Sequence, residues 1–164
     1  MDLSEKITDI KSLVKSYFSE IKNYQLPNGG YGYWSTSSKA NIYASSRVAH
    51  VYAIALERGY SPSDLPINIE GLTTYLKEVV NSKDKYGYVY SNYQRAYTNY
   101  VLALNNPEKV SISNLKSLMS ESEDFAVHSY IGLTALEIES RSKRHCKPSK
   151  NLLATIYATR NSGS

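Results

Sequence analysis

The sequence has few of the residues that cross-link small domains or bind metal ions. It contains one cysteine, Cys146, and three histidines in 164 residues. A single cysteine excludes an internal disulfide and leaves the redox compartment open. His145 and Cys146 are neighbours, and no second pair of ligands stands at zinc spacing. We therefore expect neither a metal nor a cofactor.

Long apolar runs are also missing, and the N-terminal residues do not have the pattern of a leader sequence. No run approaches the roughly 20 residues that cross a bilayer. The opening residues, MDLSEKITDIKSL, have no basic segment followed by an apolar one, so we do not expect them to be a signal peptide. The net charge of +4 is modest for a nucleic-acid-binding protein. Neither nucleic acid nor direct insertion into a membrane is an expected partner.

Catalytic groups are scarce. His50 falls among apolar residues of a predicted helix, which is typical of a core histidine. His128 and Ser129 are adjacent on another helix, and adjacent helical side chains do not face each other, so they form no dyad. The only acidic cluster stands at a helix start, where free N–H groups stabilise carboxylates; it comprises Glu121, Glu123 and Asp124. We expect no enzymatic activity.

Tyrosine, by contrast, is abundant, with sixteen copies against two Phe and one Trp. Its ring fills volume but its hydroxyl needs a partner, so many rings should lie at the edge of the core or line a groove. Two short stretches concentrate aromatic residues beside glycine. They predict a candidate interaction surface made of Tyr31, Tyr33, Trp34, Tyr86, Tyr88 and Tyr90.

Apolar residues recur at helical spacing along most of the chain, and strand-like alternation occurs only over 86–90. The predicted helices are Leu3–Ile21, Ala40–Arg58, Pro66–Asn81, Tyr93–Leu104, Ser111–Met119, Asp124–Glu139 and Leu152–Thr159. The first has one apolar stripe that should be buried. The segment Arg47–Leu56 is apolar on every side and should be the most buried of all, with Val51, Ile54 and Leu56 covered.

The helices repeat as units. Tyr31-Gly-Tyr-Trp returns as Tyr86-Gly-Tyr-Val, and the segment from Arg47 to Leu56 has an echo 48 residues later. Repeats of this length indicate stacked units that share a core. We predict an all-α fold, a partial α/α-toroid of antiparallel helical hairpins in two layers. The single domain spans 1–164, with a basic link at 141–150 and a disordered tail at 161–164.

Seven helices are too few to close such a ring. We expect either a tightened half-ring or self-association into a homo-oligomer that hides the open edge.

Several motifs occur in a familiar order. They are Asn28-Gly-Gly-Tyr-Gly-Tyr-Trp34, the helix Tyr43–Leu56, Gly59-Tyr60, Pro62, Leu72–Leu76 and Phe125-Ala-Val-His-Ser-Tyr130. In this order, from about Ile21 to Ser140, the chain resembles the thioester domain of bacterial-type alpha-2-macroglobulins, which are large protease traps. The resemblance implies an α/α-toroid, a secreted, periplasmic or cell-surface location, and two kinds of partner: neighbouring domains of a larger parent protein, and a protease.

The chain departs from that family at its reactive centre. The family's Cys-x-Glu-Gln segment is absent, because Cys146 is followed by Lys147, Pro148 and Ser149. The two glutamines, Gln25 and Gln94, should bond to solvent beside loops. We therefore expect a non-enzymatic structural or interaction module without a thioester.

Two alternatives stay open. One is a glycan- or peptide-binding helical repeat that uses the tyrosine loops. The other is a toroid enzyme of the terpene-cyclase type, which has similar Gly/Trp phrases but needs an Asp-x-Asp-Asp run that is missing here.

Overall fold

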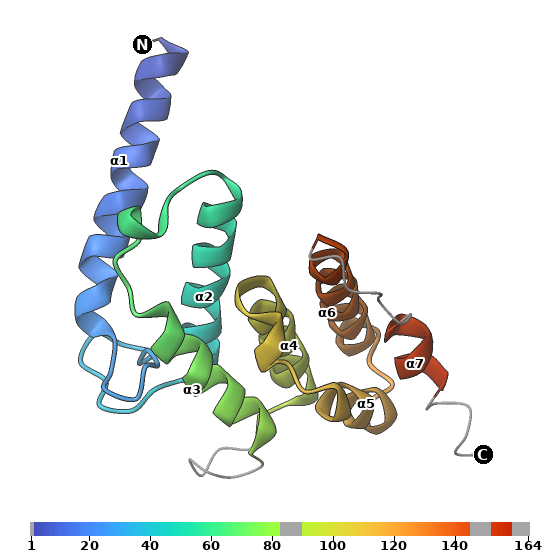
Figure 1. Cartoon of the computed structure of the whole chain (residues 1–164). Helices are drawn as coiled ribbons and strands as arrows, with labels where there is room; N and C mark the ends of the chain where they lie inside the picture. The colour runs from blue at the N-terminus through green and yellow to red at the C-terminus, as the bar shows by residue number, and fades with distance from the viewer. Residues whose placement is uncertain (1, 83–89, 145–151, 159–164) are drawn as a thin grey trace. The chain divides into compact units, whose positions relative to one another are not determined.

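A computed structural model describes residues 2–82, 90–144 and 152–158 (Figure 1). Of the described residues, 75% are helical, and none of them belongs to a strand. The α-helices are α1 (Leu3–Ile21), α2 (Ile42–Glu57), α3 (Ile69–Asn81), α4 (Asn92–Asn105), α5 (Ile112–Glu121), α6 (Phe125–Arg144) and α7 (Leu152–Ala158). Three single 3-10 turns lie between them: η1 (Lys22–Tyr24), η2 (Pro62–Asp64) and η3 (Pro107–Lys109). The all-α prediction is confirmed, and the toroid arrangement stays a prediction.

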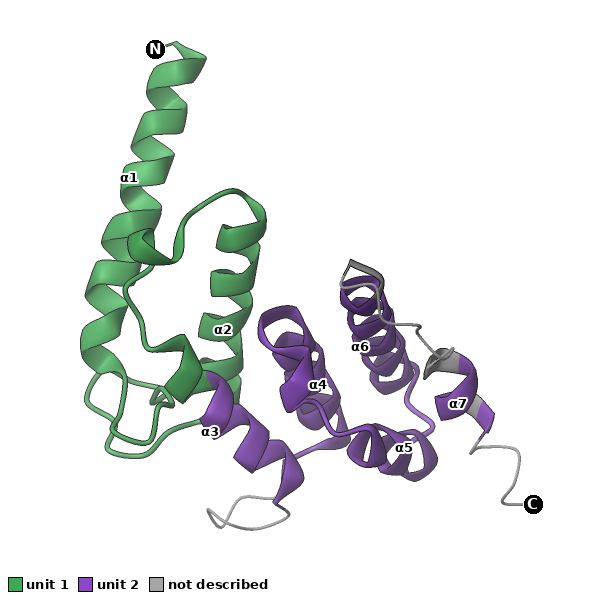
Figure 2. Cartoon of the chain, viewed as in Figure 1, with its two compact units in different colours: residues 1–72 green, residues 73–164 purple. Residues whose placement is uncertain are grey.

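The chain divides into two compact units, residues 1–72 and residues 73–164 (Figure 2). The division falls inside α3. The expectation of a single domain over 1–164 stays a prediction. Each unit also has an apolar cluster of its own.

Polar side chains set where the helices begin. The Asn41 carboxamide oxygen accepts from the backbone N–H groups of Tyr43 and Ala44, at 2.9 and 3.1 Å, and starts α2. Ser91 and Gln94 form a reciprocal capping box at α4. Such bonds satisfy N–H groups that have no partner within the helix.

Two helix limits differ from the prediction. The helix expected to begin at Pro66 begins at Ile69, because Asn68 caps it: the Asn68 side-chain oxygen accepts from the Gly71 N–H at 2.9 Å. Helix α6 continues beyond Glu139 to Arg144, so the first four residues of the basic link are helical. The rest of that link, and the tail at 161–164, lie outside the described residues.

Unit 1 is built around Phe18 of α1, which packs with Tyr52 and Ala55 of α2 and with Leu65. The rings of Phe18 and Tyr52 meet edge to face, with centroids 6.0 Å apart. This geometry favours the quadrupoles of both rings and adds to the hydrophobic gain of burial.

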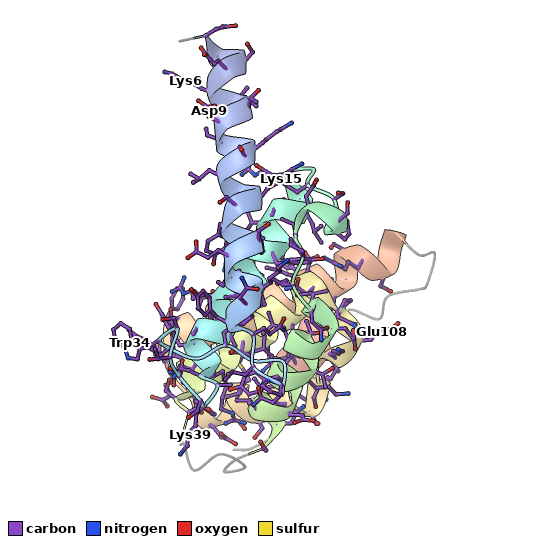
Figure 3. All side chains as sticks on the ribbon, turned by 90° about the vertical axis from the view of Figure 1, so that its left-hand side faces the viewer. Lys6, Asp9, Lys15, Trp34, Lys39 and Glu108 are labelled. Atoms are coloured by element: carbon purple, nitrogen blue, oxygen red, sulfur yellow. The ribbon has the colours of Figure 1, made fainter. Side chains whose placement is uncertain are left out.

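The apolar stripe of α1 is buried only near its C-terminal end. Leu3 is 70% exposed and Ile10 is 57% exposed, whereas Phe18 is fully buried. The first turns of α1 project past the rest of unit 1, as the positions of Lys6 and Asp9 show (Figure 3). The prediction of one buried stripe along the whole helix is therefore wrong for its N-terminal half.

The prediction for α2 is wrong as well. Val51, Ile54 and Leu56 are exposed, at 42%, 41% and 36% of their surface. Helix α2 buries the face that carries Ala49 and Tyr52 and leaves the other in solvent. An all-round apolar sequence shows that a helix can be buried on every side, but its neighbours decide whether it is.

In unit 2, α4 packs closely along α6, and α5 and α7 adjoin both α6 and each other (Figure 1). Leu115 and Leu118 of α5, Val127 and Ile131 of α6, and Ile156 of α7 share one apolar cluster. At the described positions, no helix has the length and apolar character needed to cross a membrane.

Candidate functional site

The candidate site is the loop between η1 and α2, residues 25–41. It begins with a tight turn in which the Gly29 N–H donates to the Leu26 carbonyl at 2.8 Å and the Leu26 N–H donates to the Gly30 carbonyl at 2.8 Å. Gly29 has a φ of +86°, a conformation that side chains with a Cβ rarely adopt. A Cβ there would lie 2.2 Å from the Gly71 carbonyl oxygen, so this turn and the first turn of α3 touch through their backbones.

Gln25 fastens the turn to the start of α3. Its side-chain nitrogen donates to the carbonyls of Gly29 and Asn68, both at 2.8 Å. Its side-chain oxygen accepts from the Asn68 N–H at 2.9 Å. The expectation that Gln25 and Gln94 bond to solvent is wrong, since Gln94 belongs to the capping box of α4.

Tyr31 anchors the middle of the loop in unit 1. Its N–H donates to the Ser45 hydroxyl oxygen at 2.8 Å, and its carbonyl accepts from the Asn41 N–H at 2.8 Å. The Tyr31 side chain is only 2% exposed, and its burial raises the pKa of the hydroxyl. The prediction that Tyr31 contributes to an interaction surface is therefore wrong, because its ring belongs to the core.

The side chains of Tyr33 and Trp34, unlike that of Tyr31, are exposed to solvent. They are 59% and 71% exposed, and their rings meet edge to face with centroids 5.0 Å apart. The Trp34 N–H donates to the Ser37 hydroxyl oxygen at 3.0 Å, and the Ser37 N–H donates back to the Trp34 carbonyl at 2.9 Å. Trp34 extends away from the body of the unit, with Lys39 of the same loop beneath it in the view (Figure 3). We call this pair the aromatic knob.

The structure describes one residue of the second half of the predicted surface. Tyr86 and Tyr88 lie outside the described residues. Tyr90 is described, is half-buried and precedes α4 in unit 2. Among the four predicted residues that the structure describes, Tyr33 and Trp34 form an exposed pair.

The histidines take part in local structure. The His128 ring Nε2 lies 2.6 Å from the Ser122 carbonyl oxygen, which only accepts, so Nε2 carries a proton and donates. The Ser129 hydroxyl donates to the Phe125 carbonyl at 2.9 Å. Each of the two side chains thus bonds to a backbone carbonyl. His50 is half-buried in α2, and its burial, together with the nearby Arg47, lowers its pKa.

Two residues of the acidic cluster, Asp124 and Glu121, make separate structural contacts. Asp124 accepts the Ala126 N–H at 2.8 Å at the start of α6, as the sequence predicted. Glu121 pairs with Arg95 at 3.3 Å and accepts from the Ser117 hydroxyl. Over the described ranges no three His, Cys, Asp or Glu side chains converge as metal ligands. His145 and Cys146 fall outside those ranges.

The sequence did not predict which polar residues hold the loop in place. Gln25 and Asn68 are 43 positions apart, and Tyr31 and Ser45 are 14 apart. Neither pair belongs to a motif or a periodic pattern. The glycines and the aromatic run marked the turn, but nothing in the sequence indicated its partners.

Replacing Gln25 with alanine should loosen this loop. The change removes three hydrogen bonds, and at a net 0.5–1.5 kcal/mol each, discounted for partial exposure, we expect a loss of about 1–2 kcal/mol in the free energy of unfolding. Urea unfolding followed by the fluorescence of Trp34, the only tryptophan, measures it directly. Iodide should also quench the fluorescence of Trp34 more strongly in this variant, because a mobile loop exposes more of the indole ring.

Gln94→Ala is the control, because it removes a glutamine from an exposed helix cap in unit 2. It should leave the quenching of Trp34 unchanged. An equal change in Trp34 quenching for both variants would show that Gln25 does not fasten the loop.

No family model matches the sequence, and neither a curated protein nor a solved structure matches the chain. The resemblance to the thioester domain of alpha-2-macroglobulins thus rests on its sequence motifs, and the all-α class is what the structure establishes.

Proposed function

We propose that this chain is a non-enzymatic interaction module whose aromatic knob, Tyr33 and Trp34, inserts into an apolar pocket of a protein partner. The observation that carries the proposal is a tryptophan, 71% exposed, on a loop that is hydrogen-bonded at both ends, through Gln25 and Asn41. Trp and Tyr dominate the energetic centres of protein interfaces. A loop that is already ordered loses little conformational entropy on binding, so more of the contact energy becomes affinity.

The ring geometry favours a protein over a glycan. The planes of Tyr33 and Trp34 are 76° apart, so the pair forms a projecting wedge rather than one flat platform. A sugar ring stacks best on a flat aromatic face, whereas a wedge fits a concave apolar pocket of the kind found in protein partners.

The motif resemblance extends the proposal to a family. The phrase Asn28–Trp34, which leads the resemblance to thioester domains of alpha-2-macroglobulin-like proteins, is also the segment that forms the knob. On this proposal, the chain is a part of a secreted, periplasmic or cell-surface protease inhibitor, and it contacts neighbouring domains or the captured protease.

The test uses Trp34 as its own reporter. A peptide display library is selected on the full chain, and the best peptides are titrated while tryptophan emission is recorded. We expect a blue shift, because insertion into an apolar pocket removes water from the indole. Calorimetry with Trp34→Ala should show binding at least about 30-fold weaker, which corresponds to the 2 kcal/mol of an interface hot spot.

Tyr24→Ala is the matched control, since Tyr24 is 42% exposed in the same unit but lies outside the loop. It should leave affinity within about threefold. A panel of oligosaccharides is titrated in parallel. A blue shift with a sugar but with no peptide would favour the glycan-binding alternative, and unchanged affinity in Trp34→Ala would refute the knob as the contact.

A further inference from the structure

From Phe125 to Ser140, the outer face of α6 is exposed and carries no charged side chain. Phe125 is 85% exposed, Leu136 is 53% exposed and Leu133 is 43% exposed. Three small residues share the face with them. We call this set the α6 stripe; it comprises Phe125, Ser129, Gly132, Leu133, Leu136 and Ser140. Their spacing places them on one side of a helix, where a solvated surface is ordinarily polar or charged.

The opposite face of α6 is already used. Val127, Ile131 and Ala135 are fully buried in the apolar cluster of unit 2. Helix α6 is thus apolar on two sides, and its own unit covers one of them. A contiguous exposed apolar face on a folded protein commonly marks a site of association.

The order of side chains along the stripe is self-complementary. We infer that the α6 stripe docks against the α6 stripe of a second copy of this chain, antiparallel, about a two-fold axis between Gly132 and Leu133. Phe125 and Ser140 are equally far from that midpoint, and so are Ser129 and Leu136. Each large side chain of one copy therefore meets a small residue of the other. A two-fold interface requires this reciprocity, in which residue i contacts residue j and residue j contacts residue i.

The small residues leave room for this packing. A Cβ added at Gly132 would meet nothing within 4 Å, so the space beside that glycine is open in the single chain. In the antiparallel register this space receives Leu133 of the second copy. Close approach of two helices is easiest where one of them presents a small residue to the other.

Charge at the helix ends selects the antiparallel direction. The start of α6 is acidic, with Glu123 and Asp124 exposed, and its last turn carries Lys143 and Arg144 in the sequence. Antiparallel docking brings the acidic end of each copy beside the basic end of the other, and it also opposes the two helix dipoles. A parallel pair would set like charges together and place Phe125 against Phe125.

The interface is small. A stripe of sixteen residues is about 24 Å long, and one helix pair buries less than the roughly 1,600 Å² of a standard interface. The dimer should therefore dissociate on dilution, with half-dissociation at about 10–100 μM. The inference uses unit 2 and stands apart from the aromatic knob of unit 1.

Sedimentation velocity of the full chain from about 5 to 500 μM tests the inference. The wild type should shift from monomer toward dimer as concentration rises. Leu136→Arg should stay monomeric throughout, because it places a charge in the contact. Leu136 is half-exposed, so circular dichroism should show the variant folded. Ile54→Arg, an exposed residue of α2 at 41%, is the control and should dimerise like the wild type.

Gly132→Leu separates association from folding. Leucine fills open space in the single chain and favours the helix more than glycine does, so the melting temperature should rise. The same side chain would collide with Leu133 of the second copy, so the dissociation constant should increase at least about tenfold. A wild type that stays monomeric at 500 μM, or a Leu136→Arg variant that still dimerises, would overturn the inference.

Discussion

Replacing Gly29 with alanine is expected to disrupt unit 1, whereas the same change at Gly59 is expected to be tolerated. The two glycines have nearly the same backbone, with φ of +86° and +87°. Left-handed backbone alone costs a residue with a Cβ about 1–2 kcal/mol. At Gly59 a Cβ would meet nothing within 4 Å, so that strain is the whole expected loss.

Gly29 adds a collision to the strain. Its new Cβ would lie 2.2 Å from the carbonyl oxygen of Gly71 and 2.4 Å from the carbonyl carbon. Both atoms are backbone in the first turn of α3, and they cannot retreat without breaking the bonds between Gln25 and Asn68. We expect a loss of more than about 3 kcal/mol, within the range of overpacking and backbone strain combined.

Guanidinium unfolding of both variants, followed by circular dichroism and by Trp34 fluorescence, measures the difference. For Gly29→Ala, the Trp34 emission should change in the native baseline as well, since the loop is displaced. Equal losses for the two variants would show that the loop and the start of α3 separate easily. The tight contact would then play no part in holding the aromatic knob.

The loop that contains Gly29 shows how much of the candidate site the sequence could predict. The run Asn28–Gly32 indicated a turn, and the aromatic residues beside it indicated Tyr33 and Trp34 as candidates. The sequence pattern did not distinguish Tyr31, which is buried, from Tyr33 and Trp34, which are exposed. Tyr31 lies in the core because Ser45 and Asn41 hold its backbone there. Contacts between distant positions carry no local signature, so only the structure reveals them.

The helices show the same division between local and distant causes. Periodicity and capping residues are local, and they predicted seven helices within a few residues of their limits. Burial depends on what packs against a helix, and here the pattern misled. Val51 and Ile54 of α2, and Leu133 and Leu136 of α6, are apolar at positions that unit 1 and unit 2 leave exposed. An apolar residue in the pattern reports that a face can be covered, by this chain or by another.

The second large expected effect on stability concerns helix α1. Its apolar stripe is buried near the C-terminal end of the helix and exposed near the N-terminal end. Phe18→Ala should destabilise unit 1 by about 3–5 kcal/mol, the usual range for a fully buried phenylalanine. Phe18 contacts Tyr17 and Tyr52 edge to face, at 5.1 and 6.0 Å between ring centroids, and is 0% exposed. Its removal would leave a cavity at the centre of the cluster that joins α1 to α2.

Ile10→Ala is the matched change two turns earlier on the same stripe, where the side chain is 57% exposed. Little apolar area returns to water there, and alanine has the higher helix propensity, so the net effect should be within about 0.5 kcal/mol. Chemical denaturation of both variants at low protein concentration gives the comparison. A loss at Ile10 as large as that at Phe18 would mean that the projecting turns are covered in solution, and that the pattern along α1 describes a buried stripe after all.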